Sequence, residues 1–132
     1  LVLNGDTFFE VDLNNLIEFH KKLQSELTLS LFKSNQLGRY MGVDLEDSGE
    51  ILSLQSGGNE LTLLANGGVY LVNPLALKRL NYKPYTKSSL ENDLLPKFIS
   101  LGGALYGLES SGKFIDIGVP EDYYRAQKIL KD

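Results

Sequence analysis

The sequence predicts an α/β domain built around a mixed sheet. Two observations indicate this class: the run Leu27–Lys33 alternates with the period of a strand, and apolar residues recur at helical spacing between Leu13 and Leu23. Segments of both kinds alternate along the chain. We expect the first strand to lie parallel to its neighbours and the middle strands to be partly antiparallel. With 132 residues, 42% of them hydrophobic, the chain suffices for one domain over residues 1–132.

The composition narrows the chemistry that the chain can perform. It has no cysteine, one histidine and a net charge of -4, which excludes disulfides, thiolate chemistry and a Cys/His zinc site. A bound metal would therefore need oxygen ligands, as Mg²⁺ does. Neither nucleic acid nor a membrane is expected as a partner. We expect a cytoplasmic protein, and the start at Leu1 inside an apolar run suggests a piece of a longer one.

The opening segment places a carboxylate at the end of a strand. Leu1–Leu3 predicts a short buried strand, and Asn4-Gly5-Asp6 ends it. Ligands bind outside the carboxyl ends of strands in open α/β sheets, so Asp6 stands where a metal-phosphate site is expected. The alternative is that Asn4-Gly5-Asp6 is only a turn, which these ten residues alone favour.

Helical and strand patterns divide the rest of the chain. A helix with its apolar stripe at Leu13, Leu16, Ile17, His20 and Leu23 should pack on the sheet, and His20 is assigned no chemistry. The expected strands cover residues 27–33, with one buried face, and then 39–45, 50–54, 61–72, 103–108 and 114–118. A turn at Asp47-Ser48-Gly49 should make a hairpin of the second and third of these. Residues 55–59 and 78–87 are expected to be loops.

Glycine and proline mark three further features. Asn66-Gly67-Gly68 interrupts a strand, which indicates either a bulge or a ligand contact; the pattern leaves both open. Short helices should begin at Pro74 and at Ser88-Ser89, where a capping box would have Glu91 reaching back and Pro96 limiting the helix. A final helix should begin at Pro120. Its expected apolar face consists of Tyr123, Ala126, Ile129 and Leu130.

Two strand ends carry an aspartate that is followed within two residues by a turn, and these are Asp6 and Asp116. If the fold brings them together, they form a two-carboxylate site for one divalent ion. Mg²⁺ commonly takes one or two protein carboxylates and completes its shell with water and substrate phosphates. Such a site serves phosphoryl or nucleotidyl transfer.

Several motifs resemble those of the sugar-1-phosphate nucleotidyltransferases, especially enzymes that transfer GMP to heptose or mannose 1-phosphates. The motifs occur in the family's order and nearly span the chain. They are Leu3-Asn4-Gly5-Asp6-Thr7-Phe8-Phe9, Arg39-Tyr40 with Gly42-Val43, Asn66-Gly67-Gly68-Val69-Tyr70-Leu71, and Phe114-Ile115-Asp116-Ile117-Gly118-Val119-Pro120-Glu121-Asp122-Tyr123.

The resemblance implies a Rossmann-like nucleotidyltransferase fold with a mixed sheet, of which this chain is the carboxy-terminal portion and the amino-terminal half is missing. It implies that Asp6 and Asp116 hold Mg²⁺, while Asn66, Gly67 and Glu91 serve sugar binding. The implied substrates are a sugar 1-phosphate and a nucleoside triphosphate, here GTP. The implied products are a GDP-sugar for a cell-surface polysaccharide and pyrophosphate.

The sequence departs from the family in two ways. The glycine-rich Gly-x-Gly-Thr-Arg loop is absent, and Ser56 and Gly57 stand where relatives carry a Glu-Lys pair. No obvious replacement for that lysine exists among Lys83, Lys87 and Lys97. We therefore expect these 132 residues alone to be inactive.

Three alternatives stay open. The chain could be a catalytically incomplete relative that binds a sugar phosphate, or a structural or regulatory module. A metal-dependent glycosyltransferase is a further alternative. It is disfavoured by the ending Val119-Pro120-Glu121-Asp122-Tyr123. An open sheet edge would also pair with a missing segment or with another copy, giving a homo-oligomer.

Overall fold

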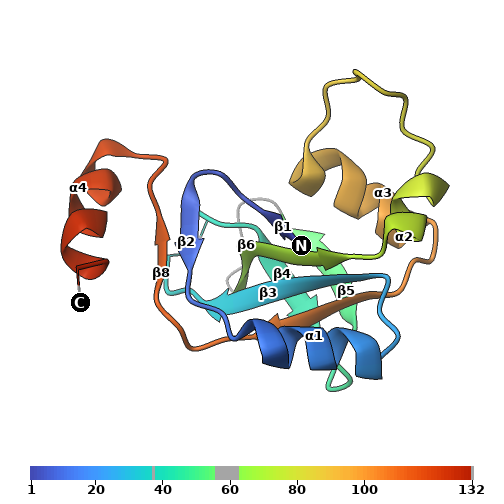
Figure 1. Ribbon diagram of the computed structural model, residues 1–132, viewed down its shortest axis with the longest axis horizontal. Helices are drawn as coiled ribbons and strands as arrows, with labels where there is room; N and C mark the ends of the chain where they lie inside the picture. The colour runs from blue at the N-terminus through green and yellow to red at the C-terminus, as the bar shows by residue number, and fades with distance from the viewer. Residues whose placement is uncertain (37, 56–62, 132) are drawn as a thin grey trace.

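The computed structural model describes residues 1–36, 38–55 and 63–131, and shows a mixed sheet with helices on both faces (Figure 1). In this part of the chain a six-stranded sheet has the order β5-β4-β6-β3-β7, with β1 also paired to β6. A separate two-stranded ladder joins β2 and β8. The strands are β1 Val2–Leu3, β2 Thr7–Phe9, β3 Leu27–Lys33, β4 Gly42–Leu45, β5 Ile51–Gln55, β6 Leu64–Val72, β7 Leu105–Glu109 and β8 Phe114–Asp116.

This arrangement confirms the α/β prediction and corrects two expectations about the first strand. β1 runs antiparallel to β6, and the one parallel pair among the described strands is β3 with β7. β1 is also exposed rather than buried, with Val2 40% and Leu3 60% accessible to solvent. The reason is positional, since β1 pairs with one end of β6 and has no described strand on its other edge.

The helices are α1 Leu13–Lys22, α2 Pro74–Arg79, the π-helical segment η1 Leu90–Leu94, α3 Leu95–Ser100 and α4 Pro120–Ile129. Asp12 caps α1 by accepting from the backbone N–H groups of Asn14 and Asn15. Pro74 begins α2, as predicted. Pro96 does not end the helix that starts after Ser89, because the π turn of η1 passes directly into α3 and tolerates a residue without an N–H at that point.

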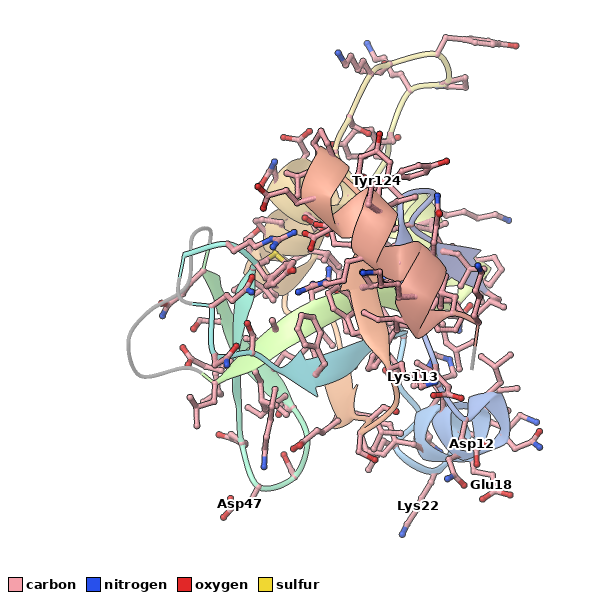
Figure 2. All side chains as sticks on the ribbon, turned by 90° about the vertical axis from the view of Figure 1, so that its left-hand side faces the viewer. Asp12, Glu18, Lys22, Asp47, Lys113 and Tyr124 are labelled. Atoms are coloured by element: carbon pink, nitrogen blue, oxygen red, sulfur yellow. The ribbon has the colours of Figure 1, made fainter. Side chains whose placement is uncertain are left out.

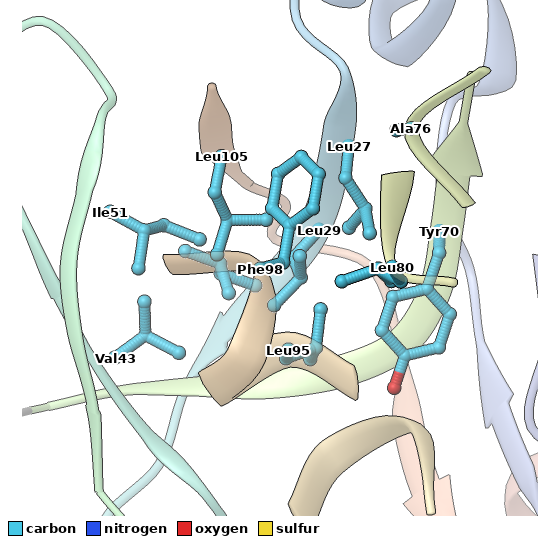
Figure 3. Packing of buried hydrophobic residues seen from close by; sticks show 11 residues of the cluster. Leu27, Leu29, Val43, Ile51, Tyr70, Ala76, Leu80, Leu95, Phe98 and Leu105 are labelled. Carbon is cyan, nitrogen blue, oxygen red and sulfur yellow. The ribbon is translucent and has the colours of Figure 1, made fainter. Parts of the chain in front are cut away.

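Two apolar clusters lie on opposite faces of the sheet. Figure 3 shows the first, in which Leu27, Leu29 and Leu105 pack against residues of α2 and α3. The second joins Leu16 of α1 to Phe9 and other residues below the sheet. β3 is therefore buried on both faces, not on one as its alternation predicted, because it is central and helices cover both sides. Each fully buried leucine contributes roughly 1.5–3 kcal/mol.

The interruption in β6 is a bulge. Between Leu29 and Leu31 on β3 stands one residue, whereas three residues separate their partners Tyr70 and Asn66 on β6. A side chain at Gly67 would place its Cβ 2.3 Å from the Phe9 ring. Gly68 has φ +77°, which favours glycine. The bulge thus lets Phe9 lie against the sheet, and it carries Asn66 into the region described below.

The final helix buries only part of the predicted face, at Ala126. Asp122 and Ala126 are its buried residues, whereas Tyr123 is 52% and Leu130 47% exposed. Figure 2 shows α4 lying across the surface, with Tyr124 on it. The helix is turned this way because the Asp122 carboxylate faces inward and pairs with Arg39.

Candidate functional site

The structure brings the two sequence-predicted metal ligands to neighbouring positions. In the β2–β8 ladder Thr7 is the partner of Asp116, and the Ile117 N–H donates to the Asp6 carbonyl at 2.9 Å. Asp6 lies exposed in the turn before β2, and Asp116 is half-buried at the end of β8. One ladder therefore brings two acids that are far apart in sequence close to each other: Asp6 lies in the turn that leads into β2, and Asp116 ends β8.

An aromatic cluster fixes this ladder to the main sheet. The rings of Phe9 on β2 and Phe114 on β8 meet edge to face at 5.7 Å, and Phe114 stacks on Phe32 of β3 at 3.8 Å. Tyr40 closes the cluster against both Phe32 and Phe114. Such pairs add about 0.5–1.5 kcal/mol each beyond the area that they bury. The position of Asp116 is therefore set by packing that begins two residues away.

One oxygen of Asp116 already has a protein partner. The Gly118 N–H donates to Asp116 Oδ1 at 2.8 Å, and a Cβ at Gly118 would lie 3.0 Å from the same oxygen. In the part of the chain that the structure describes, no third acidic or histidine side chain joins Asp6 and Asp116. A metal held here would take most of its ligands from water and phosphate oxygens, which suits Mg²⁺.

A second charged group lies close to this ladder. Arg39 and Arg125 both pair with the buried Asp122 at the start of α4, the latter at 2.9 Å. The hydrogen bond from Arg39 lowers the pKa of the Asp122 carboxyl, and the same bond raises the pKa of Arg39. The negative charge of Asp116 raises the Arg39 pKa further. These pairs anchor α4 beside the acids.

A polar cluster lies where β1, β6 and η1 meet. Asn66 Nδ2 donates to Glu91 Oε1 at 3.0 Å and to the Tyr70 hydroxyl at 2.6 Å. The Tyr70 hydroxyl and Asn4 Nδ2 also approach Glu91 Oε1, at 3.4 and 3.5 Å. Burial, reinforced by the charge of Glu91, raises the pKa of Tyr70, so the phenol stays protonated and can donate. We refer to Asn4, Asn66, Tyr70 and Glu91 as the Glu91 cluster.

The predicted sugar-binding residues separate into two kinds. Asn66 and Glu91 come together, although the sequence gives no sign that they touch. Gly67 is needed for packing against Phe9, and its binding role stays a prediction. Glu91 does not close the capping box; the Asp93 carboxylate accepts from the Ser89 N–H instead.

The remaining predicted positions lie elsewhere or cannot be placed. Ser56 and Gly57 are outside the described residues. Lys83 and Lys87 belong to an exposed loop, and Lys97 Nζ donates to the Leu80 carbonyl at 2.8 Å. Lys97 therefore has a structural partner.

The sequence prediction assigned no role to Asn4 and Tyr70. The local pattern predicts only a turn at Asn4 and a strand at Tyr70. One signal was present, since both residues stand inside motifs that resemble the family. Their connection to Glu91 needs the bulge in β6 and the antiparallel pairing of β1, neither of which a local pattern specifies.

Comparisons with known proteins agree with this geometry. The model of the nucleotidyl transferase family matches residues 1–132. A D-glycero-α-D-manno-heptose 1-phosphate guanylyltransferase of Aneurinibacillus thermoaerophilus is 37% identical over 131 residues, which is 99% of this chain and 55% of that protein. Mannose-1-phosphate guanylyltransferase 1 of Arabidopsis thaliana is 31% identical over 99% of this chain and 36% of its own length.

Solved structures give the same result. HddC from Yersinia pseudotuberculosis superposes with a TM-score of 0.77 at 33% identity, covering 97% of this chain and 53% of HddC. The same protein complexed with GMP-PN superposes with a TM-score of 0.76. The chain thus spans about half the length, or less, of the relatives it matches. It has their mixed α/β architecture over that half, and it belongs to the nucleotidyl transferase family.

Proposed function

We propose that this chain supplies the metal-binding and sugar-binding part of a sugar-1-phosphate nucleotidyltransferase that transfers GMP from GTP to a heptose or mannose 1-phosphate. The observation that carries the proposal is the pairing of the Asp6 and Asp116 segments across one ladder, with Ile117 N–H bonded to the Asp6 carbonyl. The names of the relatives support the sugar 1-phosphate and the guanylyl group.

The donor set at Asp6 and Asp116 fits Mg²⁺. Both groups are carboxylates, Asp6 is exposed, and the described residues offer no histidine or cysteine partner that would favour a softer metal. When bound, Mg²⁺ would supply neutralisation of the negative charge on the reacting phosphates. Asp6 and Asp116 would hold it, and the Gly118 N–H would orient the Asp116 carboxylate.

The proposed reaction is an in-line displacement at phosphorus. A phosphate oxygen of the sugar 1-phosphate forms a bond to the α-phosphorus of GTP, and the bond from that phosphorus to the bridging oxygen breaks. Pyrophosphate leaves with the electron pair of the broken bond. No covalent intermediate is needed, so the protein acts chiefly by positioning the two phosphates and by stabilising their charge.

The sugar would lie over the Glu91 cluster. The Glu91 carboxylate would accept hydrogen bonds from sugar hydroxyls, and Asn66 would hold the carboxylate from the protein side. Gly67 would contribute backbone rather than a side chain. The triphosphate would need groups outside these 132 residues, because the glycine-rich loop implied by the family resemblance is not among them.

Pyrophosphate release by the polypeptide that the gene encodes tests the proposal. We expect release with GTP, Mg²⁺ and either mannose 1-phosphate or D-glycero-α-D-manno-heptose 1-phosphate, and none when the sugar phosphate is left out. Binding of either sugar phosphate without turnover would favour the catalytically incomplete relative. Absence of both binding and turnover would contradict the proposal.

No helix in the described residues has the length and apolar character needed to cross a membrane.

Self-association is a further proposal, since β1 presents an open edge with apolar side chains at Leu1 and Leu3. The same edge would suit a segment that lies outside this chain. Sedimentation of the whole polypeptide distinguishes the two, because a covered edge leaves a monomer.

A further inference from the structure

We propose that Tyr70 and Asn4 are positioning residues that fix the Glu91 carboxylate for recognition of sugar hydroxyls. The inference rests on the proposed function, because it assumes that Glu91 contacts the sugar. The inference goes beyond the proposed function in two ways. It gives a positioning role to two side chains that would not touch the substrate, and it predicts which kinetic constant they control.

The first step is the geometry of the carboxylate. Three donors converge on one oxygen, Glu91 Oε1: Asn66 Nδ2 at 3.0 Å, the Tyr70 hydroxyl at 3.4 Å and Asn4 Nδ2 at 3.5 Å. None of the described residues donates to the other oxygen, Oε2. Holding one oxygen from the protein side leaves the second available to a hydroxyl of a ligand.

The second step concerns Tyr70. Its side chain is fully buried in the same apolar cluster as Leu80 and Leu95, and its hydroxyl oxygen points away from the labelled leucines (Figure 3). A buried hydroxyl is costly unless it is hydrogen-bonded, and here both of its side-chain partners, Asn66 and Glu91, belong to the Glu91 cluster. Because the ring is held rigidly in the core, its hydroxyl has a fixed position and restricts the orientation of the Glu91 carboxylate.

The third step concerns Asn4. Its backbone N–H donates to the Gly68 carbonyl at 2.9 Å, which anchors it to the bulge, and its side chain approaches Glu91. Asn4 also lies two residues before Asp6. It therefore connects the turn that carries a proposed metal ligand to the carboxylate that would read the sugar. This connection would hold the proposed metal site at a set distance from the Glu91 carboxylate, and so from the hydroxyls of the same substrate.

The fourth step is the element that carries Glu91. The residue lies in the π-helical segment η1, and such segments are frequent at functional sites. The start of η1 is capped without Glu91. Ser89 Oγ accepts from the Asn92 N–H, and the Asp93 carboxylate accepts from the Ser89 N–H. Glu91 is thereby free to face β1 and β6.

The test compares Tyr70→Phe with Tyr106→Phe in the polypeptide that the gene encodes. Both changes remove one hydroxyl, but Tyr106 has no hydroxyl hydrogen bond among the described residues and packs its ring on Phe19. For Tyr70→Phe we expect KM and the dissociation constant for mannose 1-phosphate to rise about three- to tenfold, as for loss of one modest hydrogen bond. KM for GTP should stay within about twofold, and Tyr106→Phe should change neither constant.

A double mutant separates positioning from general destabilisation. If Tyr70 acts through Glu91, Tyr70→Phe should have little further effect on sugar affinity in a Glu91→Gln background. Full additivity, or an unchanged sugar constant in Tyr70→Phe despite a lower melting temperature, would overturn the inference.

Failure of the proposed function can be distinguished from failure of this inference. If the wild-type protein releases no pyrophosphate but binds mannose 1-phosphate, the inference is decided by the dissociation constants alone. If Glu91→Gln leaves sugar affinity unchanged, or if wild type does not bind the sugar phosphate, the inference is wrong.

Discussion

Glu91 Oε1 lies 3.0 Å from Asn66 Nδ2, although 25 positions separate the two residues in the chain. This contact assigns Glu91 to a polar cluster between β6 and η1 rather than to the capping box that its spacing from Ser88 predicted. The capping role falls to Asp93, which accepts from the Ser89 N–H at 2.7 Å. The two acids of this segment therefore have different partners. Asp93 caps the start of the helix, and Glu91 belongs to the candidate sugar site.

The cap can be tested with two adjacent serines. Ser89 Oγ accepts from the Asn92 N–H at 3.1 Å, whereas the described residues give Ser88 no side-chain hydrogen bond. Ser89→Ala should lower the free energy of unfolding by about 0.5–2 kcal/mol, and Ser88→Ala by much less. Denaturant titration measures both. Equal losses in the two variants would show that Ser89 is not the cap.

The bulge in β6 predicts a strict requirement for glycine at position 67. An added Cβ would lie 2.3 Å from the Phe9 ring and 3.1 Å from the Ser30 carbonyl oxygen. Gly67→Ala should therefore cost roughly 1–3 kcal/mol of unfolding free energy. Gly5→Ala is the matched control, because a Cβ there meets nothing within 4 Å. A Gly67→Ala protein as stable as Gly5→Ala would contradict this packing.

The single histidine predicts a pH dependence of stability. His20 Nδ1 lies 2.8 Å from Thr28 Oγ1, and burial lowers the pKa of His20 below its ordinary value of 6.5. The unfolded chain thus binds this proton at a higher pH than the folded chain, so stability is retained above about pH 6.5 and falls as the pH drops through the folded pKa. Asp122, with its pKa lowered by Arg39, loses its contribution only below about pH 4.

Unfolding measured between about pH 5 and pH 7 checks this expectation. Wild type should lose stability toward the acid end, and His20→Gln, which does not protonate, should show a flatter profile. A profile of the same slope in both proteins would assign the acid loss to other groups.

Signals contained within one segment were sufficient to predict most elements. Pro74 begins α2, and Asp47-Ser48-Gly49 joins β4 to β5 in a hairpin, as expected. β4 begins at Gly42, however, later than its pattern predicted. The failures are features that depend on distant partners. Three-residue β2 is too short to show alternation, and it exists as a strand because Thr7 meets Asp116.

In the candidate site too, local features could be predicted from the sequence, whereas contacts between distant segments could not. Local turns were sufficient to predict that Asp6 lies in a turn after a strand and that Asp116 ends one, but the proximity of the two residues comes from the β2–β8 ladder. The sequence could not indicate Asn4 and Tyr70, because the role proposed for them depends on contacts with Glu91, which lies on a separate element. The predicted inward face of α4 was right at Ala126 but missed Asp122, because hydrophobic spacing does not indicate the charge pairing of Asp122 with Arg39.

The 132 residues alone should not synthesise a sugar nucleotide. They match about half, or less, of the length of their relatives, and they contain no glycine-rich triphosphate loop. Exposed Leu1 and Leu3 at the β1 edge should also make the isolated chain prone to association. Pyrophosphate release and light scattering test the two expectations. Robust GDP-sugar formation by this chain would refute the first.

Pyrophosphate release by Asp116→Asn tests the central proposal most directly, with the polypeptide that the gene encodes, GTP and a sugar 1-phosphate. Asparagine keeps the oxygen that accepts from the Gly118 N–H, so the fold should stay intact while the charge is lost. We expect Mg²⁺-dependent turnover to fall by roughly 100-fold or more. Glu121→Gln, an exposed acid in the first turn of α4, should retain activity. Unchanged turnover in Asp116→Asn would contradict the metal-binding role of the Asp6 and Asp116 pair.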